Sequence, residues 1–435
     1  MSRERWDKPK SRNVGLFVDL SLYSEALRIT SERGSITASH LRQELRQRTR
    51  GLLLVEKQSK RVAQDLVREL HEFGWLQRAS GSGQPVENVL YTLMPDGSEI
   101  LELSSQEVRR HLAVAMHKRF IIPGWFISRL WQINPTGQGE VVLPSPPRDW
   151  RPKARPWEEK DWTDDLAVQI LEASKMAQAI CLGSFPIDDK TWVQAVGNAW
   201  AHLGTWKRKR KAGASGEKIS TFSPRSRLAL AMRSAAVEIL FGTVPPGHQE
   251  QDIWTTRSRP PLLPRTFRVW CPRLADLELI FYSDSHPDIV GRLIFPTAVF
   301  RREASQPPFE KLEDIQNPDD DFLCLYQPGW GNQGEMFLQT LVQVHRLISR
   351  RVGTLYVSLL DVRDEVCRQL RLSATLFDKF LARAFRESLR PGAAQSISIE
   401  TDIREDQRSG SGLSRRPIWI DEVPYSLIAI GKIDS

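Results

Sequence analysis

The sequence has few of the features that mark secreted, membrane or metal-binding proteins. Its four cysteines, spread over 435 residues, include no CxxC pair and no spacing that indicates a zinc knuckle or a disulfide framework. The most apolar stretch, 120–131, is interrupted by Pro123 and Gly124 and contains Arg129, so it is too short and too charged to span a bilayer. The first ten residues carry both charge signs, and no signal-type apolar run follows them. We expect a soluble, cytoplasmic protein without membrane partners.

The usual sequence signatures of catalysis are also missing. No GxxxxGK[ST], GxGxxG, GxSxG or HExxH motif is found in a suitable position. The best candidates for a hydrolytic or divalent-ion site are His286-Pro-Asp288 and Asp319–Asp321, and both have the composition of turns or acidic loops. Several of the 14 tryptophans lie between the folded blocks, where pinning a linker is favoured over stacking on bases. The sequence therefore predicts a non-enzymatic protein with no metal and no cofactor.

What the chain does have is apolar sequence to form cores and a modest positive charge. Hydrophobic residues make up 40% of it, and 61 lysines and arginines exceed 53 acidic residues, which favours polyanionic partners. Residues 1–150 hold most of the excess, with 22 basic and 17 acidic side chains. Proline-rich and acidic seams predict a domain at 1–142, a linker at 143–161, a mixed domain at 162–330 and a last domain at 331–435.

In the first of these domains, two predicted helices precede two predicted strands. Thr37 is placed to cap a short helix that ends by Gly51, with Ile36 and Leu41 as a hydrophobic staple. Residues 56–73 form the second helix, because apolar residues recur on one face. Strands are expected at 74–78 and 88–93. The polar side chains expected on the outward face of the second helix are Lys57, Gln58, Ser59, Lys60, Arg61, Gln64 and Arg68.

This pattern resembles the winged helix-turn-helix domains of bacterial DNA-binding regulators. The resemblance rests on Val67–Arg78 and on Tyr91–Ile100, which is similar to the common end of such wings. It implies that the second helix enters the major groove of DNA and that Gln58, Ser59, Arg61, Gln64 and Arg68 read it. The wing departs from the family pattern, because Arg78 is its one basic residue before Glu87, and this argues against contact between the wing and phosphates. Docking of a protein partner is the alternative use of the module.

A second pattern of the same kind lies at the other end of the chain. Helices are expected at 335–351, around 362–370 and from Ser373, followed by strands at 395–400, 416–420 and 425–430. The last helix has an outward cationic face of Lys379, Arg383, Arg386 and Arg390. Between the strands, a hydrophilic tip can either cradle phosphates or remain solvated, because acidic residues offset its cations Arg404, Arg408, Arg415 and Arg416.

The middle block is expected to be helical first and strand-rich later. Helices are predicted at 164–182, 190–210 and 224–241, and strands at 266–271, 277–282 and 292–300. These elements fit a third, degenerate winged module or an α+β dimerisation domain equally well. The second helix ends in five cations that either grip phosphates or form a solvated helix end: Lys207, Arg208, Lys209, Arg210 and Lys211.

Together these patterns predict a multi-domain, mainly helical α+β protein, with winged-helix modules at both ends and a small antiparallel sheet in the middle block. The predicted function is non-enzymatic binding of double-stranded DNA in bacteria, as in replication initiators, multi-module regulators or a DNA-targeting complex. The alternative is a scaffold, because the layout also resembles kleisin-type subunits that bridge chromosome-organising ATPases and proteins of anti-phage defence. In that case the helix faces bind protein subunits, including an ATPase. Homo-oligomerisation is open in both.

Overall fold

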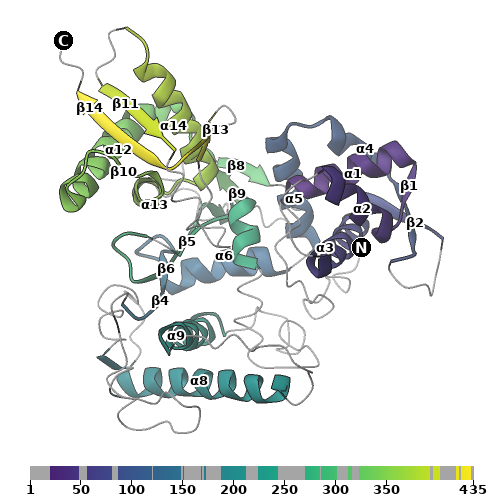
Figure 1. Ribbon diagram of the computed structural model, residues 1–435, viewed down its shortest axis with the longest axis horizontal. Helices are drawn as coiled ribbons and strands as arrows, with labels where there is room; N and C mark the ends of the chain where they lie inside the picture. The colour runs from purple at the N-terminus through teal and green to yellow at the C-terminus, as the bar shows by residue number, and fades with distance from the viewer. Residues whose placement is uncertain are drawn as a thin grey trace.

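The computed structural model is a mainly helical α+β protein with several small antiparallel sheets (Figure 1). This level of the predicted fold class is confirmed. An amino-terminal and a carboxy-terminal block lie on opposite sides of a middle block, whose helices α8 (Asp189–Lys211) and α9 (Pro224–Phe241) extend away from both. The structure describes residues 20–48, 56–80, 87–119, 121–147, 150, 168, 171–172, 188–211, 224–242, 270–284, 286–300, 312–315, 323–391, 395–401, 418–420 and 423–432.

The amino-terminal block has the order helix, short strand, two helices and two longer strands. Its three strands form an antiparallel sheet in which the last one in sequence, β3, lies between the other two. Two further helices, α4 (Pro95–Glu99) and α5 (Ser105–Arg119), follow the sheet. The first helix is not among the sequence-based predictions. The bounds are α1 (Ser21–Arg33), β1 (Ser35–Ile36), α2 (Ala38–Arg48), α3 (Glu56–Glu72), β2 (Leu76–Ser80) and β3 (Leu90–Leu93).

The local signals in this block have the structural roles expected of them. The backbone amide of His40 donates to Thr37 Oγ1 at 3.2 Å, so Thr37 caps α2. Ile36 and Leu41 are both buried, as a hydrophobic staple requires. Gly34, directly after α1, has a φ of 73°, a conformation that a side chain would strain. The sequence therefore determines where α1 ends and α2 begins.

The middle block contains two three-stranded antiparallel sheets. Their orders are β4-β6-β5 and β7-β9-β8. Strand β4, at 141–144, crosses the domain boundary predicted at residue 142. It pairs with β6, so it belongs to a sheet whose other two strands come after residue 279. The elements are α6 (Ile121–Ile133), β4 (Val141–Pro144), β5 (Ile280–Ser283), β6 (Gly291–Pro296), β7 (Ala298–Phe300), β8 (Leu312–Ile315) and β9 (Leu323–Tyr326), with α8 and α9 as given above.

Two predictions in this block need correction. Residues 270–276 are helical, so the strand predicted at 266–271 is wrong where the structure describes it, and the strand predicted at 277–282 begins only at Ile280. Trp270, Cys271 and Leu274 are buried at a helical spacing, and this tertiary burial decides the conformation over the β propensity of the segment. A strand, β8, lies at 312–315, within the acidic stretch 307–321 that the sequence marks as a seam between blocks.

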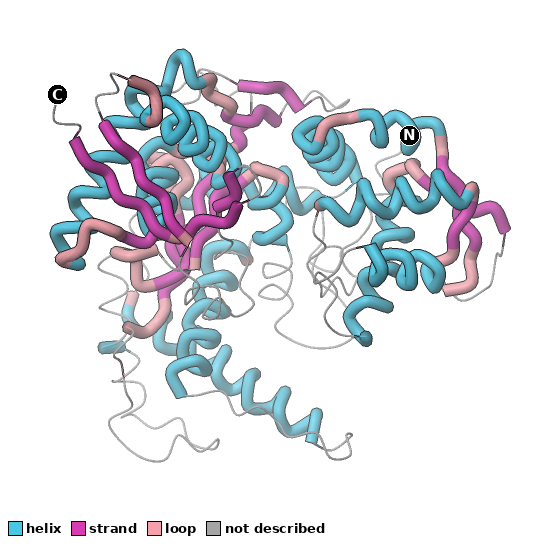
Figure 2. Tube along the Cα trace, turned by 45° about the horizontal axis from the view of Figure 1, so that its top comes forward, coloured by secondary structure: helices cyan, strands magenta, loops and turns pink. Residues whose placement is uncertain are grey.

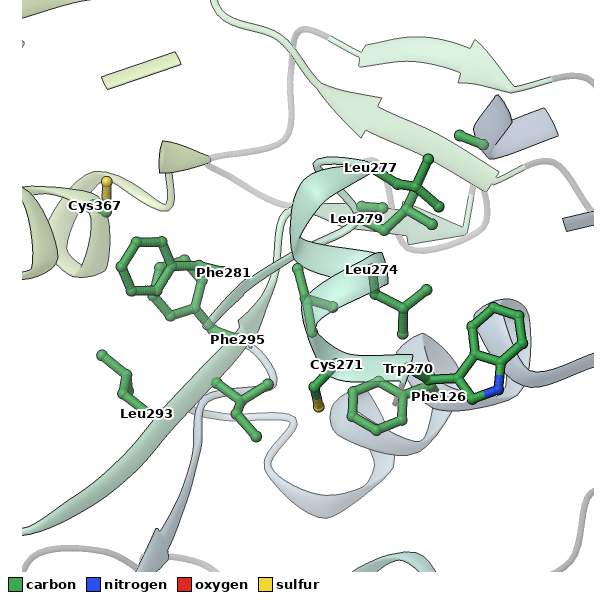
Figure 3. Packing of buried hydrophobic residues seen from close by; sticks show 14 of the residues in the cluster. Phe126, Trp270, Cys271, Leu274, Leu277, Leu279, Phe281, Leu293, Phe295 and Cys367 are labelled. Carbon is green, nitrogen blue, oxygen red and sulfur yellow. The ribbon is translucent and has the colours of Figure 1, made fainter. Parts of the chain in front are cut away.

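Aromatic side chains fill the core of the middle block. Phe281 and Phe295, from the neighbouring strands β5 and β6, stack with ring centres 4.7 Å apart. Phe126 of α6 stacks on Phe241 of α9 at 4.9 Å. Figure 3 shows Leu274 of the helical turn directed into the same cluster. Each large buried side chain contributes about 2–3 kcal/mol relative to an exposed one, so this cluster is a principal source of the block's stability.

The carboxy-terminal block repeats the element order of the amino-terminal one through its first five elements. A helix, a short strand, two helices and a longer strand, β11, follow one another, and the last strand of the block, β14, again lies at the centre of a three-stranded sheet, between β10 and β11 (Figure 2). A two-stranded ribbon, β12-β13, precedes β14. The bounds are α12 (Trp330–Val352), β10 (Val357–Ser358), α13 (Leu359–Leu370), α14 (Ala374–Ser388), β11 (Gln395–Glu400), β12 (Ile418–Ile420), β13 (Val423–Tyr425) and β14 (Leu427–Lys432).

Ion pairs between distant parts of the chain join the terminal blocks to the middle block. Arg109 of α5 pairs with Glu278 at 2.7 Å, and Glu278 has a φ of 62°, which is rare for a residue with a side chain. On the other side, Arg368 and Arg371 of the carboxy-terminal block pair with Glu140 at 3.0 and 3.2 Å. These contacts orient each terminal block against the middle one.

Candidate nucleic-acid interface

The third helix of the amino-terminal block, α3, has a polar face beside a buried one. Val62 and Leu70 are buried because apolar residues on this helix recur at helical spacing toward α1 and α2. Three of the predicted DNA-binding residues on α3 have side chains that the structure describes. Lys60 is exposed, and Gln64 and Arg68 are partly exposed. The structure therefore brings Lys60, Gln64 and Arg68 together on the solvent side of α3.

These groups are near carboxylates. Glu87, just before β3, pairs with Lys60: its Oε1 lies 2.6 Å from Lys60 Nζ. The same Oε1 accepts a hydrogen bond from Gln64 Nε2 at 3.0 Å. Arg68 lies 4.0 Å from the carboxylate of Asp65, one helical turn away. The carboxylate of Glu87 thus lies against the polar face of α3 and contacts Lys60 and Gln64, two of the residues predicted to bind DNA.

Another side of α3 is fixed to the middle block. Both oxygens of Glu69 accept hydrogen bonds from the Arg273 guanidinium, at 3.0 and 3.1 Å, and Tyr23 Oη donates to Glu69 at 2.5 Å. The side chains of Arg273 and Glu69 are only 2% and 1% exposed. Burial opposes the charge of Arg273, but the Glu69 carboxylate raises the pKa of the guanidinium above its ordinary value. This ion pair stays charged and holds α3 in place.

The third helix of the carboxy-terminal block, α14, begins at a well-formed cap. Ser373 Oγ accepts from the backbone amide of Leu376 at 3.2 Å, as the predicted N-cap requires. Phe377 and Leu381 are fully buried, and Phe380 nearly so, on the inner side. The predicted cations are exposed on the outer side of this helix and just beyond it: Lys379, Arg383, Arg386 and Arg390.

Arg383 and Lys379 each contact a neighbouring side chain, and the ion pair of Arg383 is a weak one. Arg383 Nε lies 3.0 Å from Glu387 in an exposed pair one turn apart, and its guanidinium lies 5.4 Å from the centre of the Trp330 ring. Exposed pairs of this kind contribute about 0.3–0.5 kcal/mol, so a phosphate can replace the carboxylate. Lys379 Nζ donates to Gln106 of α5 at 2.6 Å, which places the start of α14 beside the amino-terminal block.

Of the remaining predicted site residues, one has a side chain that the structure describes and the others do not. Arg78 is exposed on β2. Lys57, Gln58, Ser59 and Arg61 belong to α3, and Lys207, Arg208, Lys209, Arg210 and Lys211 end α8, but their side chains lie outside the described part of the structure. The four arginines of the predicted carboxy-terminal tip lie outside the described residues altogether: Arg404, Arg408, Arg415 and Arg416.

The candidate hydrolytic motif at His286-Pro-Asp288 lies in the contact between the middle and carboxy-terminal blocks. The buried His286 ring makes a 2.8 Å contact from Nε2 to Glu365 of α13, and Asp288 pairs with Arg351 of α12. Burial works against ionisation of Glu365, but hydrogen bonds from His286 and Gln369 keep its pKa below the ordinary value. This geometry fits a structural junction, and the second motif, Asp319–Asp321, lies outside the described residues.

The same junction contains a buried carboxylate that makes its stability depend on pH. Burial raises the pKa of Asp364 from 3.8 to about 6, against the opposing effects of Arg363 and of the hydrogen bond from Ser283. A raised pKa means that the folded state binds the proton more tightly, so the contribution of Asp364 to the free energy of unfolding is largest at low pH and is lost as pH rises through about 6.

We therefore expect Asp364→Asn to alter the pH dependence of unfolding. The wild-type free energy of unfolding should fall, relative to that of the variant, by about 2 kcal/mol between about pH 4 and pH 8. Urea unfolding at a series of pH values measures this difference. Asp96→Asn, at an exposed position on α4, is the control and should leave the profile unchanged. Parallel profiles for wild type and Asp364→Asn would contradict the assignment.

Sequence reasoning missed the acidic partners of the cations. Glu87, Glu69 and Glu278 all bind basic residues that are distant in sequence: Lys60, Arg273 and Arg109. Glu69 gave one usable signal, because a carboxylate beside the apolar stripe of an amphipathic helix requires a buried partner. Nothing in the sequence identifies which arginine that partner is.

A cavity of about 370 Å³ lies where α5, the turn at 277–278 and the end of β9 meet. Arg109 and Glu278 line it and pair with each other, and Gln327 Nε2 donates to Glu278 at 2.9 Å. Arg109 and Glu278 therefore bind each other in this wall, across the contact between the two blocks. This arrangement favours a role in joining the blocks.

Searches of protein-family models, of curated proteins and of solved structures found no match to this chain. Within the described ranges, no three histidine, cysteine, aspartate or glutamate side chains gather as the ligands of a metal ion would. Among the helices that the structure describes, none is both long and apolar enough to cross a membrane. The candidate site is thus defined by geometry alone: the helix faces with cations on α3 and α14 lie at equivalent places in two blocks whose three-stranded sheets have the same strand arrangement.

Proposed function

We propose that this protein binds double-stranded DNA without catalysis, through a winged-helix module at each end of the chain. One observation carries the proposal. Both ends begin with a helix, a short strand, two helices and a further strand, the last strand of each block lies at the centre of a three-stranded sheet, and the third helix of each has cations on its outward face. In winged-helix proteins the helix at this position enters the major groove.

The dimensions of these helices support groove binding. An α-helix with side chains is about 10–12 Å wide, close to the roughly 12 Å width of the major groove of B-DNA. Arg383 and Arg386 are three residues apart on α14 and therefore on the same side, where both can contact phosphates along one strand. On α3, an amide such as that of Gln64 can pair with adenine through its remaining donor and its acceptor.

The two modules differ in how open their cations are to a duplex. The four cations on and beyond α14 are exposed, whereas Lys60 and Gln64 on α3 share the Glu87 carboxylate. Arg68 lies near Asp65 but remains partly exposed. We therefore assign most of the sequence-independent affinity to the carboxy-terminal module.

The salt dependence of binding tests this function. For the intact chain and a mixed-sequence duplex, we expect a plot of log Kd against log salt concentration to have a slope of magnitude about 4. Each phosphate contact contributes about 0.9 to this slope, and about four to five cations can make such contacts. Fluorescence anisotropy of the labelled duplex at several salt concentrations gives the slope. Folded protein that shows no binding, or binding independent of salt, would contradict the proposal.

A second candidate function, a protein-docking scaffold, has one observation in its favour. Four apolar side chains on α12 and just after it are more than half exposed: Met336, Leu347, Val352 and Leu355. Apolar side chains left exposed along one helix are a surface that a protein partner can cover. Salt-independent association with a protein partner, lost in Leu347→Glu and accompanied by absent DNA binding, would favour this function over the first.

A further inference from the structure

Glu87 holds a fixed position against the polar face of α3. It is followed two residues later by Val89, which is 1% exposed and anchors the start of the return strand in the core. From there its Oε1 contacts Lys60 Nζ at 2.6 Å and Gln64 Nε2 at 3.0 Å. One oxygen of Glu87 therefore binds both Lys60 and Gln64, which are one helical turn apart on the solvent side of α3.

These contacts are weak in themselves. The side chains of Lys60 and Glu87 are 49% and 41% exposed, and exposed ion pairs contribute at most about 1 kcal/mol to stability. Their effect on an approaching duplex is larger, because the carboxylate neutralises Lys60 and places a negative charge where a phosphate would bind. Glu87 therefore acts mainly on polyanion binding and little on folding.

We propose that Glu87 limits the non-specific affinity of α3 for duplex DNA by competing with phosphates for Lys60 and Gln64. This inference rests on the proposed DNA-binding function. A phosphate that binds Lys60 must displace the carboxylate, so the backbone alone gains little from the contact. At a DNA site whose base edges also hydrogen-bond to Gln64, these bonds offset the free energy needed to displace the carboxylate. Glu87 is thus a residue that makes binding by α3 depend on sequence.

The test is Glu87→Gln in the full chain, with a mixed-sequence duplex as the probe. The variant keeps an oxygen that accepts from Gln64 and removes the charge. Freed to contact one more phosphate, Lys60 should increase the magnitude of the salt slope by about 0.9 and tighten binding about eightfold at about 0.1 M salt. Unchanged or weaker binding would overturn the inference.

Two further variants separate a local effect from a general one. Glu99→Gln removes the same charge from an exposed position of the same block, on α4. Because salt screens charges that are distant from the site, this variant should change the affinity less than about twofold. Lys60→Met should abolish most of the gain caused by Glu87→Gln, because the two residues act as a pair. Equal gains from Glu99→Gln, or an undiminished gain in the Lys60→Met background, would also overturn the inference.

The outcome for Glu87 is distinguishable from the outcome for the protein as a whole. If the wild type binds DNA with a steep salt slope and Glu87→Gln does not differ, the DNA-binding proposal stands and the role of Glu87 falls. If neither protein binds DNA while both remain folded by circular dichroism, both proposals fail together.

Discussion

Replacing Arg383 and Arg386 together by glutamate is expected to weaken binding of a mixed-sequence duplex about 100-fold at about 100 mM salt. Both arginines are exposed on the outer side of α14. Each substitution removes a charge-assisted contact and adds repulsion from the same phosphate. Together the two substitutions should reduce the binding free energy by about 3 kcal/mol, and about 1.4 kcal/mol corresponds to a tenfold change in Kd. The salt slope should decrease in magnitude by about 2, which anisotropy titrations at several salt concentrations measure.

A matched control exists on another helix of the same block. Arg346→Glu with Arg350→Glu changes the net charge equally, at two exposed positions on α12 and not on α14. If affinity depends on where the cations lie, this variant should lose less than about fivefold, through long-range screening alone. Equal losses in the two double variants would show that net charge, and not the face of α14, determines binding.

Removing the buried arginine at the junction of α3 should have the largest effect on stability. Arg273→Met leaves the Glu69 carboxylate buried without the guanidinium that donates to both of its oxygens, and Tyr23 still donates to it. Breaking a buried ion pair by removing one partner costs about 3–5 kcal/mol, because the other charge remains without compensation. Urea unfolding followed by tryptophan fluorescence measures the loss, and Trp270, whose ring centre lies 5.7 Å from the guanidinium, is a local probe.

The double variant Glu69→Gln with Arg273→Met tells a charge effect from a packing effect. It removes both charges, and an amide can still accept from Tyr23, so most of the lost stability should return. A loss below about 1 kcal/mol for Arg273→Met alone would contradict the structural assignment of this pair. So would a double variant that is as unstable as the single one.

Apart from α1, local sequence patterns predict the long helices of the terminal blocks, their caps and most of their strands. Ser373 caps α14 and Thr37 caps α2, because a short polar side chain followed by an apolar residue four positions later favours one backbone arrangement. The same reasoning failed at Trp270, where helical and alternating patterns overlap and burial against α6 and the sheet decides the outcome. Short segments are therefore predictable where propensity and burial agree.

The cations of the candidate site follow from helical periodicity, but their partners do not. Lys379 and Arg383 are exposed where the pattern places them. By contrast, Glu69 and Arg273 are 204 residues apart, and no local rule connects two positions at that separation. The same holds for Glu87, whose contact with α3 depends on the exact path of the chain into β3. The sequence thus predicts which surface carries charge, and tertiary structure determines how much of it a duplex can use.

The placement of the last strand at the centre of each terminal sheet affects how these modules form during synthesis. Val357 of β10 pairs with Ile428 of β14, and β11 pairs with the same strand along its whole length. Neither strand has its neighbour in this sheet until the ribosome has released residue 432, so the carboxy-terminal module can complete its sheet only after translation reaches that point. A stop codon before residue 427 would leave both outer strands with exposed edges and an aggregation-prone product.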